Sequence, residues 1–116
     1  FVMISHISMS QITGDEYPAS MSKFIIQDLL KGELGYKGLV ITDDMAMYAI
    51  TKNYPLKEAA AQSIIAGADV IIIKLFSSEA YDGVLAAVQA GDISQARLNE
   101  SAQKILELKL KRGIIK

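Results

Sequence analysis

The chain has 116 residues, of which 51% are hydrophobic and 22% are charged, and its formal net charge is −1. This balance is typical of a globular chain of at most one domain, and the interspersed charges exclude a basic surface for nucleic acid. The chain contains no cysteine, which excludes disulfides and thiolate metal sites, and no apolar run approaches the ~20 residues that a membrane span needs.

The first predicted element is a short strand over residues 1–7, which is apolar and rich in β-branched side chains. The only histidine, His6, lies at its end. A polar segment with Gly14 follows as far as residue 17 and is typical of a loop. Because the chain opens inside an apolar run, without an initiator methionine or a basic leader, we expect it to be a fragment of a longer protein.

Helices and strands alternate through the next part of the chain. Apolar residues at helical spacing predict a helix over 23–34, with Ser22 as its N-cap. The apolar run over 38–42 predicts a buried strand, and a short helical pattern follows it through residue 50. Pro55 then begins a helix that ends near residue 67.

The last predicted strand covers residues 70–73, where four consecutive β-branched side chains need cover on both faces of the sheet. Helices are predicted from residue 77 to 91 and from 93 to 112. The order is that of repeated βα units with a parallel sheet, so the fold class is α/β. Three such units do not by themselves distinguish an open sheet from a closed barrel.

Two adjacent carboxylates, Asp43 and Asp44, follow the second predicted strand. This position is the carboxyl end of a parallel strand, where α/β folds place their chemistry. From this stretch alone, a catalytic acid and a helix-capping pair are equally good interpretations. A magnesium site is a third interpretation, which requires a further acid on another strand and a lysine that Lys74 could supply.

Motifs in a fixed order along nearly the whole chain carry a resemblance to a known family. They are Val2-Met3-Ile4-Ser5-His6, Pro18-Ala19-Ser20-Met21-Ser22, the run from Leu29 to Asp44, Ala66-Gly67-Ala68-Asp69, Arg97-Leu98-Asn99-Glu100-Ser101 and Leu108-Lys109-Leu110-Lys111-Arg112-Gly113. This series resembles glycoside hydrolase family 3, most closely its β-N-acetylhexosaminidase branch. The resemblance implies that residues 1–116 are the C-terminal portion, about three βα units, of a TIM (β/α)₈ barrel.

The resemblance also implies roles for individual residues. Asp43 matches the nucleophile, which attacks the anomeric carbon of the sugar and forms a covalent glycosyl-enzyme. His6 matches a histidine close to the sugar, and Met47 matches a methionine on the rim of the site, so both are predicted substrate-binding residues. Asp44 is expected to cap the following helix turn or to support Asp43. The resemblance implies no metal and no cofactor.

One catalytic group of the family is absent from this chain. The hexosaminidase branch carries a Lys-His-Phe-Pro-Gly-His-Gly type segment whose later histidine acts as acid and base, and no such segment occurs here. His6 matches a different position. We therefore expect the isolated chain to be inactive, because it holds the nucleophile without its proton-transfer partner.

The function implied by the resemblance is removal of terminal β-linked N-acetylglucosamine from a carbohydrate, in peptidoglycan turnover. The Thr42-Asp43-Asp44-x-x-Met47 form favours this branch, since β-glucosidases more often have an aromatic residue after the nucleophile. A β-glucosidase or β-xylosidase is the enzymatic alternative. The non-enzymatic alternative is a half barrel that pairs with its missing half or with itself through open strand edges. The family includes bacterial cytoplasmic enzymes and exported lipoproteins, so the compartment is left open.

Overall fold

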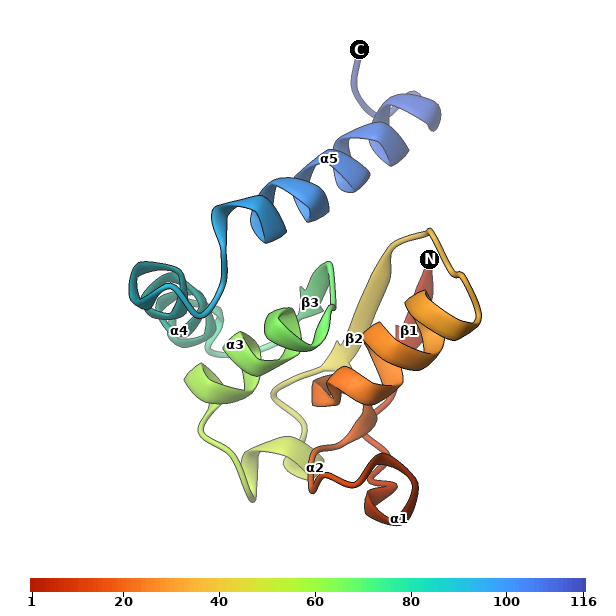
Figure 1. Cartoon of the computed structure of the whole chain (residues 1–116). Helices are drawn as coiled ribbons and strands as arrows, with labels where there is room; N and C mark the ends of the chain where they lie inside the picture. The colour runs from red at the N-terminus through yellow and green to blue at the C-terminus, as the bar shows by residue number, and fades with distance from the viewer.

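The computed structural model describes all 116 residues and contains three parallel strands with helices between and after them (Figure 1). The strands are β1 (Val2–Ile4), β2 (Val40–Asp44) and β3 (Val70–Ile72). The helices are α1 (Ser10–Thr13), the 3₁₀ turn η1 (Ala19–Met21), the π-helix η2 (Phe24–Glu33), α2 (Tyr48–Thr51), α3 (Leu56–Ala66), α4 (Ser77–Ala90) and α5 (Gln95–Lys111). The predicted α/β class and the predicted order of βα units are confirmed.

The sheet has the order β1-β2-β3, and both pairs of strands are parallel. Met3 pairs with Ile41, and Ile41 pairs in turn with Val70. The register between β2 and β3 then shifts, because Asp44 pairs with Ile72, so three steps along β2 oppose two along β3. The carboxyl ends of all three strands therefore lie at the same end of the sheet, and the irregularity in register lies beside Asp44.

The core lies between one face of the sheet and the helices; in Figure 1, α3 and η2 stand in front of the strands, whereas α4 lies to the left and α5 above. Val40 packs with Ile26, Ala66 and Ala68, and its side chain is fully buried. The cover that β3 needs on both faces is incomplete in this chain, since all three of its residues are only partly buried. On β1, Met3 is 51% exposed. One face of the sheet and both of its edges thus lack cover.

The first strand is shorter than predicted. It ends at Ile4 because the chain then leaves the sheet, where the Ile7 carbonyl accepts the Ala19 N–H at 2.8 Å and His6 bonds to Ser20. The predicted loop that follows contains the one-turn helix α1, which the polar composition of this segment did not indicate. None of the helices combines the length and the hydrophobicity that crossing a membrane requires.

The helix predicted over 23–34 is present, but it is wound as a π-helix instead of an α-helix. Its hydrogen bonds span five residues, as in the 2.8 Å bond from the Leu34 N–H to the Leu29 carbonyl. This helix packs close to the end of α3 at Gly67, where φ is +117° and a Cβ atom would lie 2.6 Å from the Gln27 side chain. The positive φ, which residues with a Cβ atom rarely adopt, explains why this position favours glycine.

Candidate active site

The carboxyl ends of the strands bring together the residues that the sequence pointed to. Asp43 and Asp44 end β2, Met47 follows them, and Lys74 follows β3. His6 lies two residues beyond β1 and bonds to the backbone of Asp44. This carboxyl end of the sheet, which we call the rim, is defined by these five residues.

Of the two adjacent acids, Asp43 has the carboxylate with fewer hydrogen bonds to the protein. Along β2 the side chains alternate, so that Val40 and Thr42 are buried while Ile41 and Asp43 are partly exposed on the face without helices. The carboxylate of Asp43 accepts one protein hydrogen bond, from the Asp44 N–H to Oδ1 at 2.7 Å. Its second oxygen is therefore available as a nucleophile or a base.

Asp44 has the opposite character, because its polar atoms are used within the protein. Its Oδ1 accepts the Ala46 N–H at 3.0 Å and the Lys74 N–H at 3.1 Å, which closes the turn after β2 and ties it to the end of β3. These backbone hydrogen bonds, that from Ala46 most strongly, hold the pKa of Asp44 below its ordinary value. Asp44 thus caps the turn that follows β2, but it does not cap helix α2, whose N-cap is Met47 with no side-chain hydrogen bond.

His6 joins three segments of the chain. Its Nδ1 lies 2.7 Å from the Ser20 hydroxyl and its Nε2 lies 2.9 Å from the Asp44 carbonyl oxygen. Ser20 belongs to η1 and is fully buried. Both ring nitrogens are thus bonded within the protein, and direct binding of substrate by His6 stays a prediction. The contact with Ser20 had no signal in the sequence beyond the motif around Pro18.

The methionines separate into core and surface. Met45 is fully buried in the main core cluster, whereas Met47 is 44% exposed just before α2. Met47 therefore lies on the rim, and its contact with a sugar stays a prediction.

No three His, Cys, Asp or Glu side chains gather anywhere in the structure as a metal site would require. The third acid of the magnesium interpretation is not beside Asp43 and Asp44.

The opposite end of the sheet is built around Asp69, whose side chain is fully buried at the start of β3. Its Oδ1 accepts the Ser101 hydroxyl at 2.6 Å and an Arg97 N–H at 3.3 Å, and its Oδ2 accepts the Val40 N–H at 3.0 Å and lies 3.5 Å from the Lys31 ammonium. Burial acts to raise the pKa of Asp69, but these hydrogen bonds and charges outweigh burial and lower it below its ordinary value.

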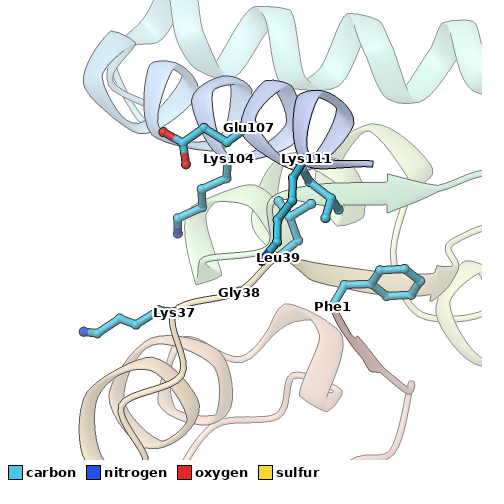
Figure 2. Close-up of a pocket in the computed structure, with 8 residues that line it drawn as sticks. Phe1, Lys37, Gly38, Leu39, Lys104, Glu107 and Lys111 are labelled. Atoms are coloured by element: carbon cyan, nitrogen blue, oxygen red, sulfur yellow. The ribbon is translucent and has the colours of Figure 1, made fainter. Parts of the chain in front are cut away.

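A cavity of about 240 Å³ lies at the same end as Asp69, between the start of β2 and α5 (Figure 2). Its polar lining comes from Lys37, Lys104, Glu107 and Lys111. β2 runs from this cavity to Asp43, so the cavity and the rim are at opposite ends of the strand. In parallel α/β folds the amino ends of the strands serve stability, and this cavity is therefore not the candidate site.

Comparison with known proteins identifies the family. Residues 1–108 match the glycosyl hydrolase family 3 N terminal domain. The chain is similar to a beta-hexosaminidase of Stenotrophomonas maltophilia, with 35% identity over 84% of this chain and 28% of the relative. It is also similar to a beta-N-acetylglucosaminidase/beta-glucosidase of Cellulomonas fimi, with 28% identity over 97% of this chain and 22% of the relative.

The fold agrees with these relatives. A solved family 3 beta-N-acetylglucosaminidase from Paenibacillus sp. str. FPU-7 superposes with a TM-score of 0.93 and 40% identity, over 97% of this chain and 22% of that protein. The chain thus spans between 22% and 28% of the length of these three proteins. The match over residues 1–108 establishes that the chain belongs to glycosyl hydrolase family 3, within the family's N-terminal domain.

Proposed function

We propose that this chain carries the nucleophile of a retaining glycosidase that removes terminal β-linked N-acetylglucosamine. The observation that carries the proposal is the Asp43 carboxylate, which ends β2 at the rim with one oxygen free of protein hydrogen bonds. An acid so placed can reach a sugar bound over the carboxyl ends of the strands. Membership of a family of glycosidases supplies the reaction class.

In the proposed reaction Asp43 attacks the anomeric carbon of the sugar while the bond to the leaving group breaks. A second group protonates the leaving oxygen, and an ester joins Asp43 to the sugar. Water, deprotonated by that same group, then attacks the anomeric carbon and releases Asp43 and a sugar of the original configuration. Retention requires the two groups to lie about 5–5.5 Å apart when both are carboxyls, and this chain holds only the nucleophile.

We propose further that the three βα units are the closing part of a TIM (β/α)₈ barrel whose other units supply the acid and base. The open edges at β1 and β3 and the half-covered side chains of β3 support this arrangement, since further strands would pair with those edges and cover that face. The 22% coverage of the Paenibacillus enzyme at high similarity supports it as well. The missing units are then the chain's necessary partner.

The identity of the sugar is the more specific part of the proposal. Two of the three relatives described above are named only for hexosaminidase or N-acetylglucosaminidase activity, and we propose N-acetylglucosamine-containing glycans of peptidoglycan turnover as the substrate. The Cellulomonas fimi relative is named for β-glucosidase activity too, which favours glucosides as the second candidate. Comparing hydrolysis of nitrophenyl N-acetyl-β-glucosaminide and nitrophenyl β-glucoside by the complete enzyme separates the two.

Covalent trapping tests the nucleophile. A 5-fluoro N-acetylglucosaminyl fluoride, incubated with the complete enzyme, is expected to leave its sugar on the peptide that contains Asp43, as peptide mass mapping will reveal. Asp44→Asn is the matched control, because it changes the adjacent carboxylate without removing the nucleophile and should still be labelled at Asp43. A label on any other residue would contradict the proposal.

The isolated chain gives a second test. Because the acid and base group is absent from it, we expect no measurable turnover of an aryl N-acetyl-β-glucosaminide by residues 1–116 alone. Turnover that disappears in the Asp43→Ala variant of the isolated chain would contradict this expectation. Sedimentation of the isolated chain, alone and mixed with the remaining units, will report whether the open edges pair with themselves or with those units.

A further inference from the structure

The backbone of Asp44 is held at both of its polar groups, which belong to the two successive peptide groups on either side of its Cα. The Asp44 N–H donates to the Asp43 carboxylate at 2.7 Å, and the Asp44 carbonyl accepts from His6 Nε2 at 2.9 Å and from the Met47 N–H at 3.0 Å. The position of the candidate nucleophile thus depends on the orientation of one residue's backbone. His6 is the only side chain that bonds to that backbone from outside β2 and its turn.

The hydrogen bonds of His6 define which nitrogen carries its proton. A carbonyl oxygen can only accept, so Nε2 must donate to Asp44, and in the neutral ring Nδ1 then accepts the proton of the Ser20 hydroxyl. Ser20 is fully buried, in a segment that packs on α3. Hydrogen bonds therefore link the core through Ser20 and His6 to the carbonyl of Asp44, and the N–H of the same residue bonds to Asp43.

We propose that His6 is a positioning residue for the glycosylation step: oriented by Ser20, it holds the carbonyl of Asp44 and so fixes the backbone of that residue, whose N–H aims Asp43 at the anomeric carbon. This inference rests on the proposed function of Asp43 and goes beyond it, because it assigns His6 to the protein's own backbone instead of to the sugar. A fixed nucleophile attacks faster because less of its freedom is lost on reaching the transition state.

The geometry makes a prediction that a sugar-binding His6 does not make. If His6 acts through Asp44, its loss slows covalent attack and leaves affinity for the product N-acetylglucosamine nearly unchanged. We expect His6→Ala to slow labelling by the fluoro sugar about 10- to 100-fold, the range in which small displacements of a reacting group fall. His6→Gln should retain more of the rate than His6→Ala, since its amide N–H₂ can still donate to the Asp44 carbonyl.

Ser20→Ala and Ser22→Ala form a matched pair. Both serines are fully buried in the same short segment, but the Ser22 hydroxyl donates to Asp15 Oδ2 at 3.0 Å and takes no part in the link to Asp43. We expect Ser20→Ala to slow labelling and Ser22→Ala to label at the wild-type rate. Thermal unfolding of each variant will show that the rates refer to folded protein.

The measurements are made on the complete enzyme with the rate constant for covalent labelling and the inhibition constant of N-acetylglucosamine. Slower labelling of His6→Ala and Ser20→Ala with an inhibition constant within about twofold of wild type supports the inference. Labelling at the wild-type rate in both variants, or an inhibition constant that rises as far as the rate falls, overturns it. If His6→Ala does not fold, Ser20→Ala and His6→Gln decide the matter alone. Failure of the wild-type enzyme to label would instead overturn the proposed function.

Discussion

Asp43 and Asp69 lie at opposite ends of the sheet and differ in what surrounds their carboxylates. Asp69 is fully buried and accepts hydrogen bonds on both oxygens from a serine, a backbone N–H and two cationic side chains. Asp43 is partly exposed and accepts one bond, from the N–H of the next residue. The two side chains are thus chemically identical, but the carboxylate of Asp69 accepts hydrogen bonds on both oxygens and that of Asp43 on only one.

The difference separates an acid that stabilises the fold from the candidate catalytic acid. A carboxylate whose oxygens are all bonded to the protein joins elements together, here β2, β3, η2 and α5, and has no free lone pair for a substrate. A carboxylate left with a free oxygen contributes little to the fold and can react. Substitutions at the two positions should therefore have opposite effects on stability and on activity.

The largest effect is expected for Asp43→Asn. We expect the rate of covalent labelling in the complete enzyme to fall by about 10⁴-fold or more, because the amide cannot attack the anomeric carbon. The free energy of unfolding should change by less than about 0.5 kcal/mol, since only one short-range hydrogen bond is altered. Labelling kinetics and urea unfolding of the same preparation measure both. A large loss of stability would contradict the comparison.

Asp69→Asn should reverse this pattern. The amide leaves the cations of Lys31 and Arg97 without their anion, and we expect the free energy of unfolding to fall by about 3 kcal/mol. Urea unfolding measures the loss. Asp28→Asn is the control, because Asp28 pairs with Lys23 on the surface, where both side chains are at least half exposed, and its loss should cost less than about 1 kcal/mol. Equal losses in the two variants would rule out a special role for Asp69.

The contribution of Asp69 to stability should also depend on pH. The pKa of Asp69 is lower in the folded chain than its ordinary value near 3.8, so its ionised form stabilises the fold at every pH above that value. This contribution is lost as the pH falls through the lowered folded pKa. We therefore expect the stability difference between wild type and Asp69→Asn to be constant from pH 7 to about 5 and to shrink below about pH 4. A difference that grows on acidification would contradict the assignment.

The smallest effect concerns backbone strain in the segment between β3 and α4. Phe76, after β3, is the one residue other than glycine with a positive φ, at +62°. Its side chain is 67% exposed, so little packing opposes a substitution. Asparagine adopts this conformation more readily than phenylalanine, and we expect Phe76→Asn to raise the free energy of unfolding by about 0.5–1 kcal/mol. Thermal unfolding measures the gain, and a loss of stability would indicate that Phe76 packs on the protein.

Several features could be predicted because they depend on neighbours in the sequence. Periodicity located the strands at β2 and β3 and the helices between them, and Asp43 followed from an apolar strand that stops at an acid. The length of β1 could not be predicted. The strand ends at Ile4 because the chain then leaves the sheet, and Ile7 bonds to Ala19, which is twelve residues away. The π winding of η2 was missed for a similar reason, since apolar spacing does not distinguish hydrogen bonds that span four residues from those that span five.

The amino-acid sequence by itself determined the order of strands and helices, the family and the position of the candidate nucleophile, because each depends on residue types at short spacing. Only the tertiary structure decided what holds each acid. Ser20, His6 and Asp44 are 14 and 38 residues apart, and Asp69 meets Ser101 across 32. Contacts of this kind arise when separate elements pack, because the hydrogen-bonding needs of buried polar groups are met by whichever partners the fold brings near.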